Sequence, residues 1–406
     1  MYQDLKSKLA LYMSNQVKKE VEPPKPETVS TTEMEGVECF YKDTPYFVIE
    51  NKYPLSYFHG GFRLGEVLEL DMQHLLKISS DPQKELRVQD FVFLDTETTG
   101  LSGGAGTVAF LIGVGFFDEN FFTLRQYFMR DYDEEPAVLG SLCNLLSERG
   151  VMVTFNGRSF DWNLLKTRFT CNRIRPAFNE PVHLDLLYPA RSIWKLKLQS
   201  CRLSSLEENI LGETRIDDIP GYMIPDVYFK YLEDRDTTEV RKVIRHNELD
   251  ILSMVSLMLK INFLLKDPLA ETEDEKELLG VGRLFENKGD RENGMRCYDA
   301  CTGSENSAIK GTASKRLADL YKKNGDHGKA ADLFEKILED SKTVNIPAMI
   351  ELAKYYEHRE KNPSKALEMV EGAFNACITM GLRKSSYFLD LKKRSERLKR
   401  KLANQK

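Results

Sequence analysis

The chain has 406 residues, of which 41% are hydrophobic and 30% charged, so it holds enough apolar material for sizeable cores and is not disordered throughout. A chain of this length usually forms two to three domains. The net charge of −5 excludes a uniformly basic surface, which many nucleic-acid-binding proteins present.

Apolar runs and cysteines indicate the cellular compartment in which we expect the protein. No apolar run is long enough for a membrane helix, and the first thirty residues lack the continuous apolar core of a signal peptide. The seven cysteines are scattered, odd in number and without a Cys-x-x-Cys pair, which fits neither a disulfide framework nor a structural zinc site. We therefore expect a cytoplasmic protein without a membrane partner.

The first 36 residues are expected to form a short helix and a flexible linker. Leu5, Leu9 and Met13 recur among polar residues over residues 1–18, which predicts an amphipathic helix. Prolines and charged residues follow to about residue 35, and such a composition cannot bury a core. The pattern leaves open whether the helix docks on the main domain, docks on a partner or is a weakly ordered terminus.

Residues 37–85 read as a small β-rich segment. Short apolar runs at residues 40–41, 46–49 and 66–70 alternate with glycine, proline and aspartate, as strands between turns do. The sequence assigns no chemistry to this segment.

Residues 86–266 show an α/β pattern. Strands are predicted at residues 91–94, 110–117, 121–129, 151–155 and 182–186, and helices at residues 136–146, at 162–169 and then out to residue 265. Such an alternation predicts a central mixed sheet with flanking helices.

Residues 275–400 are predicted to form an all-α domain of helical repeats. After an acidic stretch, apolar pairs recur about every 36 residues, and Gly294, Ala330 and Ala366 recur in one register. Small residues and aromatics at these offsets resemble the tetratricopeptide repeat, a stacking helix pair. The third unit lacks the turn glycine of the first two, and a generic helical bundle remains the alternative.

Carboxylates follow two of the predicted strands and recur on a later helix. Asp95 and Glu97 come directly after the strand at residues 91–94, where alternate residues point the same way. Asp161 stands where a second strand gives way to a helix, and His246 and Asp250 are spaced to share one helix face. Neighbouring carboxylates resist joint ionisation unless a cation lies between them.

This set of acids predicts a metal site. Two hard divalent cations, Mg²⁺ or Mn²⁺, prefer oxygen ligands, and a pair of them about 3.5 to 4 Å apart activates water and stabilises the leaving oxygen of a phosphodiester. The glycine-rich stretch after Thr98 allows a close approach of backbone to a ligand. It lacks the Lys-Ser/Thr pair of a phosphate loop, so a nucleotide-cradling role has little support.

The order of the motifs points to a family. Asp95-Thr96-Glu97-Thr98-Thr99-Gly100-Leu101, Asn156-Gly157 with Phe160-Asp161, and His246-Asn247-x-x-Asp250 follow the order of the three motifs of the DEDD 3′–5′ exonucleases. Over roughly residues 88–262 the chain resembles the YprB-type ribonuclease H-like family. This resemblance implies a ribonuclease H-like fold and a metal-dependent 3′–5′ exonuclease acting on DNA or RNA.

The resemblance also implies roles for single residues. Asp95, Glu97, Asp161 and Asp250 match the four metal-binding acids, and His246 matches the residue that orients or deprotonates the attacking water. By their place in the motifs, the residues expected to bind substrate are Thr98, Gly100, Leu101, Asn156, Arg158 and Phe160.

His246 departs from the family patterns. The DEDD enzymes carry either Tyr-x-x-x-Asp or His-x-x-x-x-Asp, whereas this chain has a histidine at the tyrosine spacing. An imidazole titrates near neutral pH and can serve as a base, but the spacing does not establish its reach. The four acids therefore support metal binding, whereas the spacing of His246 leaves the rate of hydrolysis open.

Structural interpretations of the same residues remain open. The two acids of the first motif can cap a turn, Asn156 and Asp161 are types that favour turns and helix caps, and His246 can be a structural histidine. Asp185, on the strand at residues 182–186, has either a supporting or a purely structural role.

A local basic track keeps nucleic acid possible despite the net charge. Between residues 158 and 202, nine basic residues stand against the acids Asp161, Glu180 and Asp185. We expect a single-stranded nucleic-acid end as substrate and a protein partner for the repeats. The nine are Arg158, Lys166, Arg168, Arg173, Arg175, Arg191, Lys195, Lys197 and Arg202.

Two other functions stay open. One is a catalytically weak or inactive nuclease-like scaffold that acts through its repeats. The other is a metal-dependent hydrolase of small phosphorylated molecules, for which the chain shows no pocket signature.

Overall fold

The computed structural model describes residues 34–81, 87–100, 104, 106–340 and 344–404. The expected N-terminal helix and most of its linker lie outside these residues. Within them, no helix combines the length and the apolar character needed to span a membrane.

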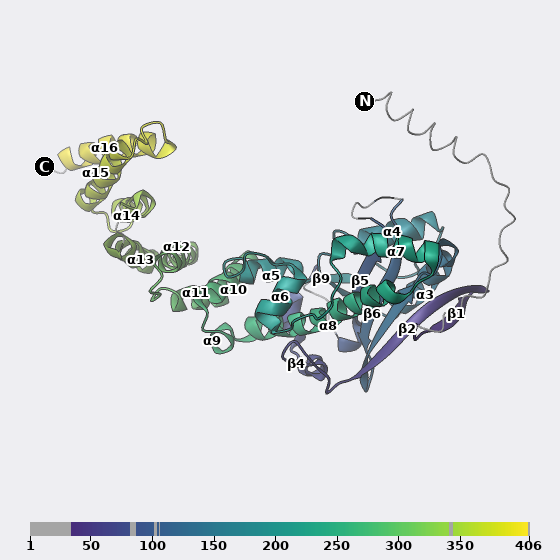
Figure 1. Ribbon diagram of the computed structural model, residues 1–406. Helices are drawn as coiled ribbons and strands as arrows, with labels where there is room; N and C mark the ends of the chain where they lie inside the picture. Colours follow the sequence, from purple (N-terminus) through teal and green to yellow (C-terminus); the bar gives the residue numbers. More distant parts are fainter. Residues whose placement is uncertain (1–33, 82–86, 101–103, 105, 341–343, 405–406) are drawn as a thin grey trace, which may run out of the picture.

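One mixed sheet lies at the centre of the N-terminal two thirds of the chain. Its strands are β1 (Val37–Tyr41), β2 (Thr44–Pro54), β5 (Phe91–Thr98), β6 (Ala109–Phe117), β7 (Phe121–Phe128), β8 (Val151–Thr154) and β9 (Val182–Asp185). They lie in the order β1-β2-β7-β6-β5-β8-β9 (Figure 1). β5, β8 and β9 are parallel, and the other neighbouring pairs are antiparallel. The predicted mixed sheet is confirmed.

Helices flank this sheet, as the alternating pattern predicts. They are α2 (Met72–Ile78), α3 (Glu135–Ser147), α4 (Asp161–Cys171), α5 (Leu187–Trp194), α6 (Leu203–Leu206), α7 (Ile224–Asp234) and α8 (Thr238–Lys266). The short helix α9 (Pro268–Glu271) follows α8 and contacts the first two helices of the C-terminal part. Shorter elements are the hairpin β3 (Phe58–His59) and β4 (Phe62–Arg63), the 3₁₀ turns η1 (Leu64–Glu69), η2 (Val88–Asp90), η3 (Tyr132–Glu134) and η5 (Gly221–Met223), and the π-helical turn η4 (Glu207–Leu211).

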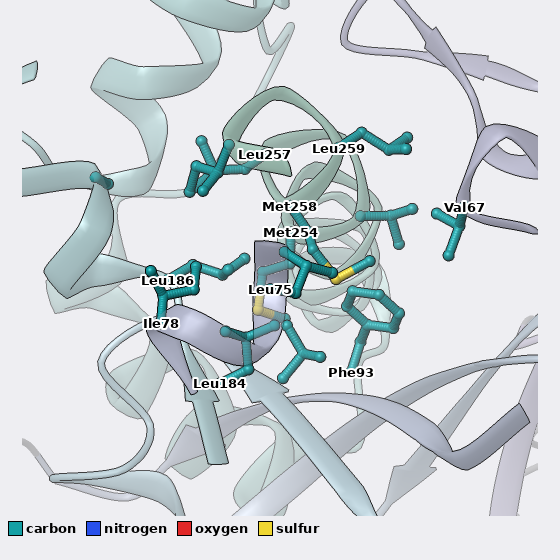
Figure 2. Packing of buried hydrophobic residues seen from close by; sticks show 14 of the residues in the cluster. Val67, Leu75, Ile78, Phe93, Leu184, Leu186, Met254, Leu257, Met258 and Leu259 are labelled. Atoms are coloured by element: carbon teal, nitrogen blue, oxygen red, sulfur yellow. The ribbon is translucent and has the colours of Figure 1, made fainter. Parts of the chain in front are cut away.

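The central strand β5 is buried on both faces. Phe91 and Phe93 belong to the apolar cluster that contains α8, whereas Val92 and Leu94 pack in the cluster that contains α3 and α4. Figure 2 shows Phe93 close to Met254 and Met258 of α8. Because side chains alternate along a strand, the residues that follow divide in the same way, with position 95 on the α8 side and position 96 on the α4 side.

The segment at residues 37–85 differs from its prediction as a β-rich segment in two elements, the helix α2 and the turn η1. β1 and β2 extend the main sheet, because β2 pairs with β7. Residues 66–70, expected as a strand, lie mostly in the 3₁₀ turn η1, where Leu64 and Val67 are fully buried and Leu68 is exposed. A three-residue period of burial fits a 3₁₀ turn and not the alternation of a strand.

The C-terminal third is a domain of paired helices. They are α10 (Glu275–Asn287), α11 (Arg291–Ala300), α12 (Ser307–Asn324), α13 (His327–Asp340), α14 (Ile346–His358), α15 (Pro363–Thr379) and α16 (Ser386–Ala403). In Figure 1 the pairs follow one another away from the sheet. The predicted small residues Gly294, Ala330 and Ala366 are buried in α11, α13 and α15.

The first helix pair is anchored on the sheet domain. A Cβ at Gly280 of α10 would lie 2.2 Å from the carbonyl oxygen of Ile193 in α5, so the two helices touch through their backbones. Trp194 Nε1 donates to Glu277 Oε1 at 3.0 Å, and Lys197 Nζ lies 2.7 Å from the same oxygen. The helical domain therefore begins as part of the core of the sheet domain.

The turns between the paired helices predict one stabilising substitution. Gly289, Gly325 and Lys361 occupy equivalent turns with φ of 82°, 90° and 55°. A lysine in this left-handed region costs about 1 kcal/mol that glycine avoids. Lys361→Gly should therefore raise the free energy of unfolding by about 0.5 to 1 kcal/mol, measured by thermal or urea denaturation. Lys361→Ala keeps the Cβ and should bring no gain; an equal gain from alanine would refute the strain argument.

Candidate active site

Parallel strands deliver the predicted residues to one edge of the sheet. β5 carries Asp95 and Glu97 near its end, and β8 leads into the turn before Asp161, the first residue of α4. α8 packs against β5 and β6 and carries His246 and Asp250. The acids of all three motifs therefore gather at this edge, close enough for Asp250 and Asp161 to repel Asp95.

A buried chain of amides holds Asp95. Asn247 Nδ2 donates to Asp95 Oδ2 at 2.8 Å, and Gln126 Nε2 donates to Asn247 Oδ1 at 2.9 Å. Neither amide side chain is exposed to solvent. Gly113 provides the space, because a Cβ there would lie only 2.1 Å from Asn247 Oδ1. One oxygen of Asp95 is thus fixed by a neutral donor.

Asp161 is held from the α4 side of β5. Thr96 Oγ1 donates to Asp161 Oδ1, and Gly157 leaves room for the carboxylate, since a Cβ there would lie 2.9 Å from Oδ2. Burial raises the pKa of Asp161 to about 6, although the hydrogen bond from Thr96 acts in the opposite direction. Burial therefore disfavours the ionised form of this acid unless a cation lies close to it.

Arg215 contacts the acid on α8 and has no role in the sequence prediction. Its guanidinium donates to Asp250 Oδ1 and to both oxygens of Glu207, at 2.7 and 2.6 Å. Burial alone would lower the pKa of Arg215, but Asp250 and Glu207 raise it, so the group is a permanent cation. The sequence offers no means of finding Arg215, because it lies in an irregular loop, belongs to no motif and has no regular spacing from Asp250.

The acids repel one another in the absence of a cation. Burial raises the pKa of Asp95 and Glu97 well above the usual range, and repulsion from the neighbouring carboxylates adds to this. The donor set of four carboxylates fits Mg²⁺ or Mn²⁺ in its chemistry. In their present rotamers, however, no three Asp, Glu, His or Cys side chains of the described residues form a cluster that could hold a metal ion.

The hydrogen bonds described above account for this separation. Thr96, Asn247 and Arg215 draw Asp161, Asp95 and Asp250 toward three different neighbours. Each of these three side chains donates to one oxygen of its carboxylate, so the other oxygen of that carboxylate remains available to another ligand.

The turn between β8 and α4 is shaped by Asp185. The carboxylate accepts hydrogen bonds from the backbone N–H groups of Asn156 at 2.8 Å, Arg158 at 3.2 Å and Leu187 at 3.1 Å. Asn156 has a φ of 69°, the left-handed conformation that asparagine tolerates. Asp185 therefore has a structural role, and it orders the turn that carries predicted substrate residues.

The other predicted substrate residues are placed as follows. Arg158 is exposed and Phe160 is half-buried in the turn before α4. Thr98 Oγ1 donates to the carbonyl of Gly100 at 2.8 Å, so this hydroxyl stabilises its own turn. Leu101 lies outside the described residues.

His246 is held by a carboxylate that the sequence motifs do not include. Its Nδ1 lies 2.7 Å from Asp218 Oδ1, and its Nε2 lies 3.9 Å from Asp250 Oδ2. The side chain of His246 is 16% exposed. The predicted shared face of His246 and Asp250 is present, and Asp218 is an addition to the site.

Only part of the predicted basic track is free to meet a ligand. Arg168 pairs with Glu135, Lys166 with Glu180, and Lys197 with Asp274 and Glu277. The six remaining basic residues are exposed: Arg158, Arg173, Arg175, Arg191, Lys195 and Arg202.

Comparisons with known proteins agree with this architecture. A family model described as the RNase H superfamily matches residues 92–262, a range that contains every predicted acid. The chain is 32% identical over 358 residues to the uncharacterized protein YprB of Bacillus subtilis. That alignment covers 85% of this chain and 84% of the relative, so the similarity extends beyond the sheet domain into the C-terminal helices.

Proposed function

Because the chain belongs to the family of YprB and carries a ribonuclease H-like domain, we propose that it is a metal-dependent 3′–5′ exonuclease that hydrolyses phosphodiester bonds of DNA or RNA. One observation carries this proposal. Asp95, Glu97, Asp161 and Asp250 gather from β5, α4 and α8 at a single edge of the sheet. Buried acids that repel one another in this way favour a divalent cation.

These four acids are the residues that would hold two Mg²⁺ or Mn²⁺ ions. When bound, such ions supply an activated water and stabilise the leaving oxygen of a phosphodiester. The oxygens of Asp95, Asp161 and Asp250 that are not bound by Asn247, Thr96 and Arg215 are the ones that we assign to the metal.

The residues around the acids suit a nucleic-acid end. Arg158 is exposed in the turn that Asp185 orders, and this turn leads into Asp161. In this position Arg158 can bind a substrate phosphate. Asn156 and Phe160 belong to the same turn, Thr98 ends β5 and Gly100 follows it, and Leu101 is a candidate from its motif alone. His246 is the candidate base, since a neutral imidazole accepts a proton from water near neutral pH.

The helical domain is proposed to bind a protein partner. A groove lined by α12, α13 and α14 contains Lys322 and Phe334. Much of its charge is already paired, as between Lys322 and Glu351 and between Arg316 and Glu286. The separation of the acids favours a second candidate function, that of a weakly active or inactive nuclease-like scaffold acting through this domain.

Oligonucleotides labelled at either end test the exonuclease proposal. The purified chain is incubated with single-stranded and duplex DNA and RNA, with Mn²⁺, Mg²⁺ or a chelator. We expect metal-dependent shortening that produces a ladder from a 5′-labelled strand and labelled mononucleotide from a 3′-labelled strand. No degradation with metal, or equal degradation by an Asp95→Ala variant, would reject the proposal and leave the scaffold function.

A further inference from the structure

We propose that Asp218 is the positioning residue for His246, which it holds with the proton on Nδ1 so that the bare Nε2 faces Asp250. The catalytic meaning of this pair rests on the proposed nuclease function, but the pair itself does not. It would explain how a histidine at the tyrosine spacing can serve as the base.

The short contact between Asp218 and His246 requires a proton. Asp218 Oδ1 lies 2.7 Å from His246 Nδ1, a distance typical of a hydrogen bond that involves a charged group. A carboxylate is an acceptor only, and a bare imidazole nitrogen is also an acceptor. Two lone pairs at this distance would repel, so Nδ1 must be the nitrogen that carries hydrogen.

Arg215 does not compete for the same nitrogen. Its Nη1 lies 3.1 Å from His246 Nδ1, but a nitrogen that already carries hydrogen cannot accept a bond from it. Nη1 finds an acceptor in Asp218 Oδ2 at 3.3 Å, and the other guanidinium donors bind Glu207 and Asp250. Asp218 therefore accepts from His246 with one oxygen and from Arg215 with the other.

The second nitrogen of His246 is left for the reaction. In the neutral ring with hydrogen on Nδ1, Nε2 has a free lone pair. It lies 3.9 Å from Asp250 Oδ2, too far for a direct hydrogen bond and suited to a water molecule between the two groups. A water at this point would face both the candidate base and a proposed metal ligand.

The fold fixes Asp218 in this place. Asp217 adopts a φ of 54°, so the chain turns sharply just before Asp218 and returns to α8. Glu207, only 2% exposed, binds Arg215 through both oxygens, and Arg215 contacts Asp218 in turn. The side chain of Asp217 is 79% exposed and pairs with Lys242, so this neighbour provides a matched control.

Long-range ¹H–¹⁵N spectra of histidine rings in the metal-free full chain test the pair directly. They distinguish Nδ1–H from Nε2–H, and a His246→Gln variant identifies the relevant signals among the six histidines. The spectra are recorded at about pH 8. We expect Nδ1–H in the wild type and in Asp217→Asn. In Asp218→Ala we expect a change to Nε2–H, because Arg215 is then the remaining neighbour of Nδ1.

Activity with Mn²⁺ gives the second readout. Asp218→Ala should lower kcat about 10²-fold with little change in KM, and Asp218→Glu should recover part of the loss. An Nε2–H ring in the wild type, or an unchanged ring in Asp218→Ala, would overturn the proposal. If the wild type does not hydrolyse nucleic acid, the nuclease function fails, and the spectra still decide whether Asp218 orients His246.

Discussion

Asp95→Asn is expected to lower Mn²⁺-dependent hydrolysis at least about 10³-fold while it makes the metal-free chain more stable. The loss in rate follows because a proposed metal ligand is removed, and metal-ion stabilisation of the transition state contributes several kcal/mol. The asparagine keeps the shape of the side chain and can still accept the hydrogen bond from Asn247. A merely structural residue would show the opposite combination, with lower stability and preserved chemistry.

The gain in stability has a definite dependence on pH. Burial and the repulsion from Asp250 and Asp161 raise the pKa of Asp95 in the folded chain. A carboxyl whose folded pKa lies above its unfolded value loses stabilising free energy as the pH rises between the two values. The advantage of asparagine should therefore be larger at about pH 8 than at about pH 5, and about 1 kcal/mol or more at the higher pH.

Thermal denaturation with chelator and with Mn²⁺ measures both effects. The wild type should gain more stability from Mn²⁺ than Asp95→Asn does, because a bound ion offsets the repulsion among the acids. Asp133→Asn changes an exposed carboxylate of η3 and should alter neither stability nor rate. If Asp95→Asn destabilised the metal-free chain, or kept its activity, the metal-site assignment would be wrong.

The main features of the fold could be predicted because they depend on local pattern. β5 and β8 begin with the apolar runs 91–94 and 151–153, which are typical of strands buried on both faces, and β9 is buried throughout although it carries His183 and Asp185. The acids follow these runs, and parallel strands bring their ends together. The 3₁₀ turn η1 was missed because its short apolar run reads like a strand, and only its contacts show which side chains are buried.

The surroundings of the acids could not be predicted in the same way. Arg215 and Asp218 lie in an irregular loop without periodicity, and only the tertiary fold brings them to α8. Asn247 stood inside a recognised motif, but its role depends on Gln126 and on the space at Gly113, two residues of neighbouring strands. Sequence spacing identifies what a helix face presents, whereas contacts between distant elements decide what each side chain binds.

The number of basic residues along the sequence overstates the charge that can face a ligand. The basic residues between 158 and 202 include Arg168 and Lys197, which the fold uses in ion pairs with Glu135 of α3 and Glu277 of α10. A count along the sequence cannot separate such structural cations from those that face a ligand. The exposed remainder, with Arg158 directly before the site, is the part of the track that supports nucleic-acid binding.

Gly113→Ala is expected to destabilise the chain by about 3 kcal/mol and to weaken hydrolysis, although it adds a single methyl group. The new Cβ would lie 2.1 Å from Asn247 Oδ1 and 2.5 Å from Ile251 Cδ1, so α8 or its side chains must move. Movement of Asn247 would break its hydrogen bonds to Asp95 and Gln126, and the amide of Asn247 is fully buried, so its polar atoms would lose their partners. Urea denaturation measures the loss, and the Mn²⁺-dependent rate measures its effect on the site.

A double-mutant cycle locates the cause of that loss. Asn247→Ala removes the side chain that the new methyl group would strike, so the two substitutions together should cost less than the sum of their separate costs. Gly221→Ala serves as a control, since a Cβ at Gly221 would meet nothing within 4 Å. Strict additivity in the cycle would mean that the cost arises elsewhere, for instance at Ile251. A coupling of about 1 kcal/mol or more would instead place Gly113, Asn247 and Asp95 in one interacting unit.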